Sequence, residues 1–270
     1  MKSKLFFSGL LVLALLNVNS ALFAQITETR NVSGFSAIEA GSVFDITVNK
    51  ADTESLVIEA DETVMPFVRT EVKNGVLKLY LKDNHKAKNI RTPLKATIGV
   101  RELDKIILSG ACKLTSDDVF DVRNFDIRLS GACTMKFNVK TGKLEADLSG
   151  ASNLNLTAEA EKVKFDLSSA SNLRLQLNAN KAAFDMSGAC KADIKGTVDK
   201  ANFETSGACN IKADDLLCKI MLIEGSGASK LEVNVSEHLD VRASGACTVH
   251  YRGRPVININ TSGASKVRSL

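Results

Sequence analysis

Ser-Gly-Ala-Cys, at Ser109–Cys112, is the first of nine copies of one short motif. The other copies have Ser in place of Cys in four cases and Ser169 in place of the glycine in one: Ser130–Cys133, Ser149–Ser152, Ser168–Ser171, Ser187–Cys190, Ser206–Cys209, Ser226–Ser229, Ser244–Cys247 and Ser262–Ser265. Successive copies start 21, 19, 19, 19, 19, 20, 18 and 18 residues apart. A period near 19 residues, kept over the whole series, predicts a fold of stacked repeats.

The residues around the motif alternate between apolar and polar. Two places after the motif stands an apolar residue, such as Leu114 or Met135, and most copies are apolar again two places further on. Apolar residues also stand three and five places before the serine, as Phe165 and Val163 do before Ser168. Alternation of this kind indicates a strand with one buried face. Each repeat is therefore expected to contain a strand, the Ser-Gly-Ala corner, a second strand and a shorter polar return.

The length of the repeat selects among the repeat folds. A unit of about 19 residues is too short for a helix and two strands, but it can form one turn of a β-solenoid with a perimeter of roughly 60 Å. Each turn then pairs in parallel with its neighbours, about 4.8 Å away, so that equivalent side chains stack in columns. We therefore expect an all-β fold, a parallel β-helix or β-solenoid of such turns, over residues 109–270.

Residues 25–108 precede the first clean motif and are expected to start the solenoid and to cap it. Ala40–Val48 looks like a degenerate corner followed by its strand. Val68–Lys73 and Val76–Leu81 are β-rich runs on either side of Asn74-Gly75, which predicts an antiparallel hairpin. A cap of this kind would cover the hydrophobic end that a solenoid otherwise exposes.

Residues 1–24 have the pattern of a secretory signal peptide. Lys2 and Lys4 precede the apolar run Leu5–Leu16, and Ala24 precedes the expected cleavage point. An uncleaved membrane anchor is the less favoured alternative, because the apolar run is shorter than the roughly 20 residues that a span needs. We therefore expect an exported protein, at the periplasm, the outer-membrane surface or outside the cell, with no transmembrane segment in the mature chain.

The charge balance argues against nucleic acid as a partner. The sequence has 35 Lys and Arg against 31 Asp and Glu, a formal net charge of +4. Removal of the predicted leader deletes Lys2 and Lys4, so that 33 − 31 leaves +2. No basic stripe interleaved with aromatic residues is present. The basic stretch Lys82–Thr92 is interpreted as a solvated loop rather than a binding patch.

Five of the six cysteines occupy the fourth motif position, and Cys218 lies outside the pattern. Export to an oxidising compartment raises the question of disulfides, for which Cys112 with Cys133 and Cys190 with Cys209 would be on adjacent turns. In-register neighbours stand about 4.8 Å apart, whereas a disulfide needs Cβ atoms about 3.8 Å apart. Free exchange of Cys with Ser indicates a small buried residue. We therefore favour free thiols over disulfides, and over a metal site, since the sequence has no CxxC pair.

A column of carboxylates stands two places before the serine in five consecutive repeats. This acidic column consists of Asp147, Asp166, Asp185, Glu204 and Glu224. Four places earlier in the first four of these repeats runs a lysine ladder, about 13 Å away along the strand, made of Lys143, Lys162, Lys181 and Lys200. The acidic column is the candidate binding site, as a cation site or a charged strip for a partner. A solvated face whose spacing only reflects the repeat is the alternative.

The sequence offers no catalytic constellation and indicates no cofactor. It contains no nucleophile elbow, no HExxH pattern and no phosphate-binding loop. Nine equivalent serines without a nearby histidine indicate structure rather than one nucleophile. A second acidic group, formed by Asp117, Asp118 and Asp121, falls in the 21-residue interval and is interpreted as a bulge. An enzyme that acts on carbohydrates is not excluded, because parallel β-helices carry such enzymes, but fold alone is an analogy.

The nine corners, with Gly34–Ile38 and Phe44–Val48 after a signal peptide, resemble the putative auto-transporter adhesin, head GIN domain family of secreted bacterial proteins. The resemblance covers roughly residues 30–265 and implies a right-handed parallel β-helix and an exported, adhesive role. It supplies no catalytic or ligand residues. The sequence therefore predicts a non-enzymatic binding or cell-envelope protein that engages an unknown surface glycan or protein. Alternatives are a carbohydrate-active enzyme and a purely structural envelope protein, and the last turn is a candidate for self-association.

Overall fold

A computed structural model describes residues 25–82 and 94–270. The predicted signal peptide and residues 83–93, which include all of the basic stretch Lys82–Thr92 except Lys82, lie outside the described residues. The described part of the chain is almost entirely β-structure. The strands run β1 (Gln25–Arg30), β2 (Ala37–Ala40), β3 (Phe44–Lys50), β4 (Ser55–Asp61), β5 (Val68–Lys73), β6 (Val76–Leu81), β7 (Leu94–Val100), β8 (Lys105–Leu108), β9 (Lys113–Leu129), β10 (Thr134–Leu148), β11 (Asn153–Leu167), β12 (Asn172–Met186), β13 (Lys191–Thr205), β14 (Asn210–Gly225), β15 (Lys230–Ala243), β16 (Thr248–Arg252), β17 (Val256–Thr261) and β18 (Lys266–Ser269). The short 3-10 turn η1 (Met65–Phe67) is the helical element of the described residues.

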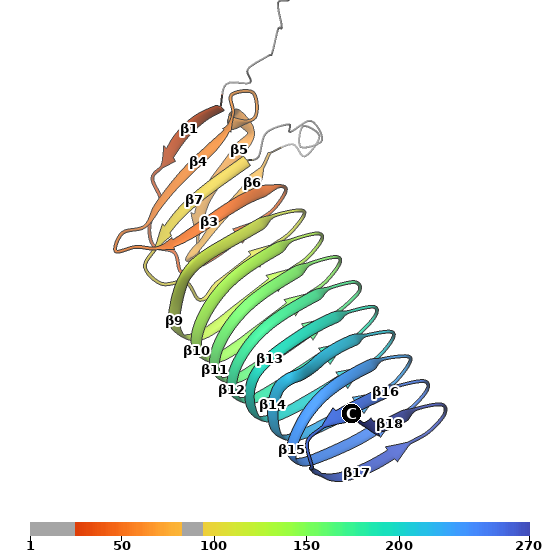
Figure 1. Ribbon diagram of the computed structural model, residues 1–270. Helices are drawn as coiled ribbons and strands as arrows, with labels where there is room; N and C mark the ends of the chain where they lie inside the picture. Colours follow the sequence, from red (N-terminus) through yellow and green to blue (C-terminus); the bar gives the residue numbers. More distant parts are fainter. Residues whose placement is uncertain (1–24, 83–93) are drawn as a thin grey trace, which may run out of the picture.

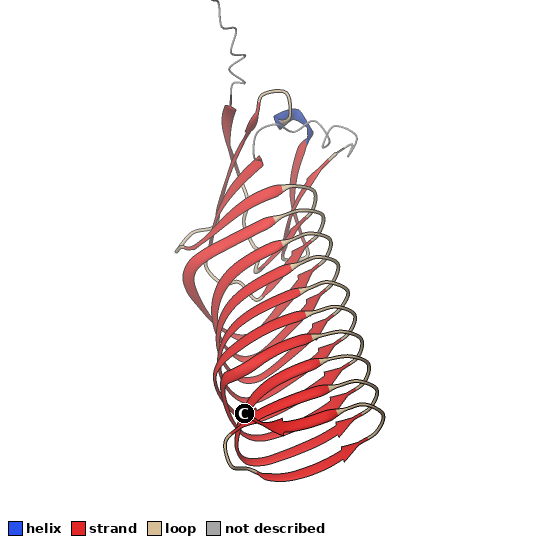
Figure 2. Cartoon of the chain, turned by 45° about the vertical axis from the view of Figure 1, so that its right-hand side comes forward, coloured by secondary structure: helices blue, strands red, loops and turns tan. Residues whose placement is uncertain are grey.

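The repeats form a parallel β-solenoid, as the motif spacing predicts. β9 to β15 each make one turn and lie side by side down the molecule (Figure 1). Their registers repeat the sequence period: Met135 is opposite Leu154, which is opposite Leu173. The loops between these long strands stack along one edge of the solenoid, where the Ser-Gly-Ala corners lie (Figure 2).

The expected polar return is a bend within one continuous strand rather than a separate loop. β10 extends over 15 residues without a break. Its alternation of buried and outward residues is interrupted once, where Gly142 and Lys143 both face outward. Pairing with β11 continues on both sides of this bend, from Thr141 with Ala160 to Lys143 with Lys162. Each turn therefore has two arms, and the bend keeps its strand partners because every neighbouring turn bends at the same place.

The interior between the two arms is filled by columns of like side chains. Before the last turn, the predicted core columns are buried, and the residue immediately before each motif serine, such as Leu148 or Leu167, adds a further buried column. Phe165, Phe184 and Phe203 stack with ring centroids 5.4 and 4.6 Å apart and nearly parallel planes. The core is thus a continuous set of ladders, as expected for a solenoid in which each turn contacts its neighbours.

The 21-residue interval between the first two motifs is absorbed as a bulge in β9. The register with β10 shifts between Lys136 and Asn138, opposite Thr115 and Val119. Asp117 and Asp118 lie in this bulge, as the sequence predicts, but Asp121 does not: it is back in regular register, opposite Lys140.

The N-terminal region extends both arms of the solenoid and then closes them with antiparallel strands. On one arm β3 pairs in parallel with β7 and β9, and β4 and β1 follow in antiparallel fashion. On the other arm β2 pairs in parallel with β6 and β8, and β5 forms the outer strand. β5 and β6 form the predicted hairpin, with positive φ at Asn74 and Gly75. The predicted cap is therefore confirmed.

Candidate functional site

The corners hold the turns together through their backbone. The glycine at the second motif position has positive φ throughout, and Ser169 adopts the same conformation with φ of 63°. A Cβ on Gly188 would lie 2.7 Å from the carbonyl oxygen of Ser169 in the preceding turn. That closeness lets the next residue, Ala189, donate its N–H to the same oxygen at 2.7 Å. Glycine is needed here for both conformation and space.

The fourth motif residue donates a hydrogen bond to the serine carbonyl of its own motif in five copies, those of Cys133, Ser152, Ser171, Cys190 and Cys209. The Ser152 hydroxyl donates to the carbonyl oxygen of Ser149 at 2.9 Å, and the Cys133 thiol donates to that of Ser130 at 3.2 Å. All six cysteines are buried and free, which agrees with the expectation of free thiols. Burial raises the pKa of the Cys190 thiol to about 11, so it is protonated at neutral pH. Serine and cysteine therefore do the same structural work at this position.

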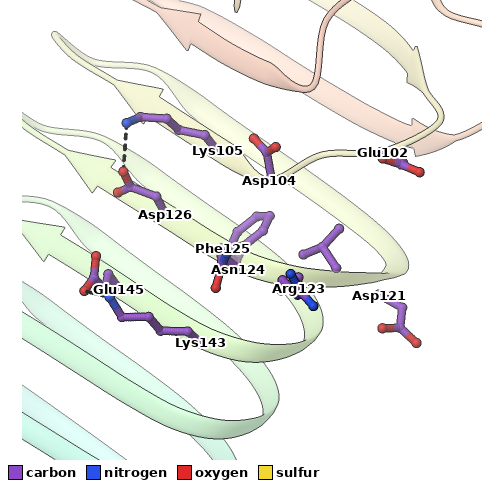
Figure 3. A pocket seen from close by; sticks show the side chains of 11 residues that line it. Glu102, Asp104, Lys105, Asp121, Arg123, Asn124, Phe125, Asp126, Lys143 and Glu145 are labelled. Atoms are coloured by element: carbon purple, nitrogen blue, oxygen red, sulfur yellow. Dashed lines mark ion pairs between the residues drawn. The ribbon is translucent and has the colours of Figure 1, made fainter. Parts of the chain in front are cut away.

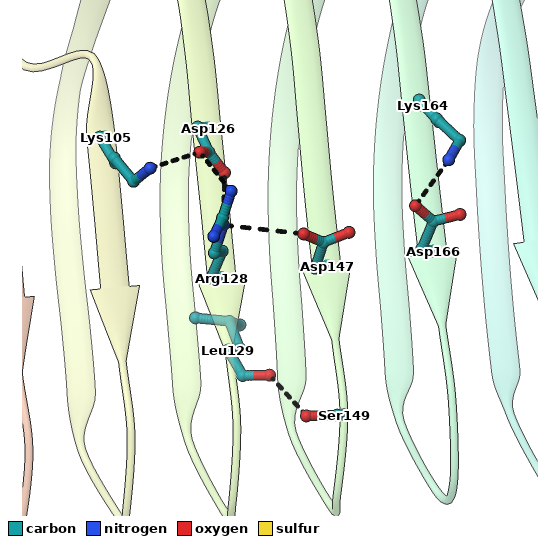
Figure 4. A network of polar contacts seen from close by, with 8 residues as sticks. All are labelled: Lys105, Asp126, Arg128, Leu129, Asp147, Ser149, Lys164 and Asp166. Carbon is teal, nitrogen blue, oxygen red and sulfur yellow. Dashed lines mark hydrogen bonds and ion pairs between the residues drawn. The ribbon is translucent and has the colours of Figure 1, made fainter.

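The acidic column lies on the outer face of one arm, beside the corners. Asp147, Asp166, Asp185, Glu204 and Glu224 come from β10 to β14 and are directly opposite one another in register. The same register places Arg128 opposite Asp147 at one end of the column and Arg242 opposite Glu224 at the other. Figure 4 shows Arg128, Asp147 and Asp166 on successive strands. The structure therefore brings together all five residues of the candidate site as one strip.

Cations within the chain neutralise part of this column. The Arg128 guanidinium is 3.7 Å from Asp147, and it also contacts Asp126, which Lys105 binds at 2.8 Å (Figure 4). Lys164 binds Asp166 at 2.9 Å, and Arg242 binds Glu224 at 2.8 Å. Burial, together with the nearby Asp166 carboxylate, nevertheless raises the pKa of Asp147.

The middle of the column keeps a free carboxylate. Glu204 accepts a hydrogen bond from the Asn202 amide at 2.9 Å. Asp185 is exposed and, among the described residues, has no ion-pair or hydrogen-bond partner. The residue two places before Asp185 is Ala183, which stands opposite Lys164 in the neighbouring turn. In the previous turn, the ammonium group of Lys164 pairs with Asp166. Asp185 has no such partner because Ala183 has only a methyl group at the equivalent position.

Two shallow grooves follow the column along the solenoid and meet at Asp185. One, of about 510 Å³, is lined by Arg128, Asp147, Asp166 and Asp185 on one side and by motif serines on the other. The second, of about 370 Å³, runs from Asp185 past Glu204 and Glu224 to Arg242. The free carboxylate is therefore at the centre of a groove that crosses many turns.

The strip offers a row of surface carboxylate oxygens on successive turns. No three His, Cys, Asp or Glu side chains gather into a metal-holding group in residues 25–82 and 94–270. The motif serines along the groove are engaged with the preceding turn, as when the Ser149 hydroxyl donates to the carbonyl oxygen of Leu129 at 3.4 Å (Figure 4). Carboxylates in a row, each offering two acceptor oxygens, suit ammonium or guanidinium groups on an extended partner.

The structure also contains a larger hollow that the sequence reading does not predict. It measures about 620 Å³ and lies where the bulged turn meets the cap, near Glu102, Asp104, Arg123 and Phe125 (Figure 3). Its walls mix both signs of charge, and Lys105 and Asp126 pair across one side of it. The 21-residue interval between the first two motifs indicates that this turn is irregular. The interval does not predict where the side chains of the turn lie.

The last turn exposes apolar side chains, one at an outward position equivalent to His238 and one at a core position that is buried in the earlier repeats. β17 pairs with β15 along one edge only, and β18 does so with β16. Val256 is 69% exposed, and Ile259, at a core position, is 47% exposed. The predicted self-association through this end stays a prediction.

The fold and the site define a repeat β-solenoid with charge-patterned outer faces. The family model for the putative auto-transporter adhesin, head GIN domain, matches residues 34–175 and 158–255. The chain belongs to this family, as the motifs predict, and membership implies an exported or surface protein.

Solved structures show the same fold over nearly the whole chain. A putative adhesin from Parabacteroides merdae has a TM-score of 0.69 at 17% identity and covers 91% of this chain and 96% of its own. A putative lipid-binding protein from Parabacteroides distasonis has a TM-score of 0.67 at 21% identity, with the same two coverages. A putative adhesin from the same organism has a TM-score of 0.68 at 17% identity and covers 92% of this chain and 97% of its own.

The comparison with curated proteins found no significant match. Within the described residues, no helix has the length and apolar character needed to cross a membrane.

Proposed function

We propose that this protein is an exported, non-enzymatic binding protein of the adhesin kind, and that the acidic column is its binding strip. The observation that carries the proposal is the groove centred on Asp185, which follows five in-register carboxylates across successive turns. Uniform chemistry repeated along one axis suits an extended partner with repeated positive charges. Catalysis would instead gather unlike residues in one cleft.

The lipid-binding neighbour suggests a second ligand class, which the packing of this chain does not favour. The space between the two arms is filled by stacked Phe, Leu and Ile side chains. A lipid would therefore have to lie on an outer surface, where the acidic column would repel anionic headgroups. Lipid vesicles belong in the binding test as a comparison.

The test uses purified residues 25–270, with and without calcium. We would measure binding to a panel of surface glycans, matrix proteins, bacterial envelope fractions and lipid vesicles, beside the Asp166→Asn/Asp185→Asn variant. Saturable binding that the variant loses supports the proposal. No binding by either protein, with unchanged circular dichroism, contradicts it and favours a structural envelope protein. Calcium-dependent cleavage of an acidic polysaccharide, lost in the variant, would instead establish an enzyme.

A further inference from the structure

The lysine ladder is as regular as the acidic column and lies on the same arm. Lys143 is opposite Lys162, which is opposite Lys181, which is opposite Lys200. All four side chains are exposed. They come from β10 to β13, which are neighbouring turns (Figure 1). Parallel strands in register place successive ammonium groups about one strand spacing, roughly 4.8 Å, apart at their roots.

Elsewhere on the solenoid, adjacent turns pair opposite charges. Lys140 binds Glu159 at 3.0 Å, Lys195 binds Asp215 at 3.2 Å and Lys219 binds Asp199 at 2.6 Å, each across one turn. Arg242 and Glu224 follow the same rule at the end of the acidic column. Charge pairing between turns is therefore the usual arrangement on this surface.

The ladder departs from that arrangement. Lys143 pairs with Glu145 within its own strand at 2.6 Å. Lys162, Lys181 and Lys200 make no ion pair and no hydrogen bond with any described residue. The carboxylates next to them in the chain form no ion pair with them: Asp199 pairs with Lys219, and Glu161, exposed at the bend, makes no ion pair with a described residue. Three like charges on adjacent strands repel one another without internal compensation, which an external anion would supply.

The surroundings of the ladder select among anions. On the same arm the next outward positions carry Lys164, Ala183 and Asn202, so the face offers no aromatic platform for stacking bases. The acidic column begins about 13 Å further along each strand and repels any polyanion wide enough to reach it. A thin, single-stranded polymer that runs along the solenoid axis avoids that repulsion.

We propose that Lys162, Lys181 and Lys200 bind a linear anionic polysaccharide that crosses β11, β12 and β13 along the solenoid axis. One carboxylate or sulfate of the polymer meets one ammonium group per turn. This site is separate from the acidic column, for which we propose a positively charged partner. The protein would therefore bind two different ligands, on two parallel strips of one face.

The test compares two triple variants of residues 25–270 with the same change in net charge. Lys162→Ala/Lys181→Ala/Lys200→Ala removes the ladder. Lys191→Ala/Lys212→Ala/Lys266→Ala removes three other exposed lysines that form no ion pair. Binding would be measured by calorimetry at low and high salt against a polyuronate, a sulfated glycan, a neutral glycan and single-stranded DNA. Thermal unfolding verifies that each variant is folded.

We expect wild type to bind the polyuronate or the sulfated glycan at low salt, and the better of the two identifies the anionic group. The ladder variant should lose about tenfold in affinity and much of its salt dependence, because each exposed ion pair contributes a modest amount. The control variant should stay within about twofold of wild type. Equal losses in both variants, equal binding of single-stranded DNA, or no binding by wild type would each overturn the proposal. Binding of anionic glycans tests the ladder alone, so its failure leaves the acidic column untouched.

Discussion

The glycine at the second motif position sets the distance between turns. In most turns the following Ala donates its N–H to the previous turn at 2.7 or 2.8 Å, but Ala170, after Ser169, does so at 2.9 Å. Ser169 is the one motif residue at this position with a Cβ, and its φ is 63°. At the neighbouring corners a Cβ in this position would lie against the backbone of the preceding turn, so we expect Ser169 to carry strain there.

At the second motif position, replacing serine by glycine should stabilise the protein, and replacing glycine by alanine should destabilise it. Ser169→Gly should raise the free energy of unfolding by about 0.5 kcal/mol, since relief of the left-handed strain exceeds the added chain entropy. Gly150→Ala should lower it by about 2 kcal/mol or more, because its Cβ would press on the carbonyl oxygen of Gly131. Urea unfolding measures both. A neutral Gly150→Ala variant would show that the turns can separate at little cost.

The sequence alone predicts the motif glycine as a corner residue, because positive φ is a local property. It does not predict that glycine is also required by the preceding turn, since that contact depends on the spacing between turns. The same holds at the fourth position: the exchange of Ser and Cys predicts a small buried residue, but the donated hydrogen bond that both make appears only in the folded corner.

At the scale of single strands, the aromatic stack should dominate local stability. Phe184 lies between Phe165 and Phe203 and is 1% exposed. Phe184→Ala should cost about 3–5 kcal/mol in the free energy of unfolding, because neighbouring turns cannot close over the cavity. Arg174→Ala, an outward residue of the same strand, is the matched control and should change stability by less than about 0.5 kcal/mol. Similar losses in the two variants would contradict a core made of stacked columns.

The carboxylate at the start of the acidic column should make stability depend on pH. Burial and the Asp166 charge raise the pKa of Asp147, so the folded state holds its proton more tightly than the unfolded state does. The resulting stabilisation is present below the unfolded pKa and is lost as pH rises through the folded pKa. Asp147→Asn should therefore raise the melting temperature near neutral pH and have little effect in strong acid. A lower melting temperature at neutral pH would mean that the Arg128 pair outweighs the repulsion.

Strand order, register and the hairpin follow from the sequence because they depend on alternation, period and turn chemistry. The continuous bend does not, since polar residues such as those around Gly142 suit either a loop or the outer side of a bent strand. The bend is stabilised by its neighbours in the stack, which is information that one repeat does not carry.

For the whole molecule, the exposed last turn predicts self-association of residues 25–270. Val256 and Ile259 present apolar surface next to unpaired strand edges, which favours pairing with another chain. Sedimentation velocity should show a dimer that grows with concentration, and Ile259→Lys should shift it to monomer. Thr261→Lys, on the same strand and also exposed, is the comparison for loss of β17 itself. A wild-type monomer at high concentration would contradict the prediction.

The residues of the candidate strip could be predicted from spacing, because a parallel register makes equal sequence positions neighbours in space. The free state of Asp185 could not, since it depends on which side chains reach it from adjacent turns. The hollow beside Phe125 was also beyond prediction, because it arises where an irregular turn meets the cap.

The most direct test of the central claim measures binding of an oligolysine peptide to wild type, Asp166→Asn/Asp185→Asn and Asp193→Asn at low salt. Asp193 is a carboxylate on the other arm of β13 and forms no ion pair, so its variant controls for one lost charge. A strip that recognises positive charge predicts saturable binding to wild type and to Asp193→Asn, with at least about a tenfold loss in the double variant. Equal affinity for all three proteins would contradict the claim that the acidic column is a binding strip.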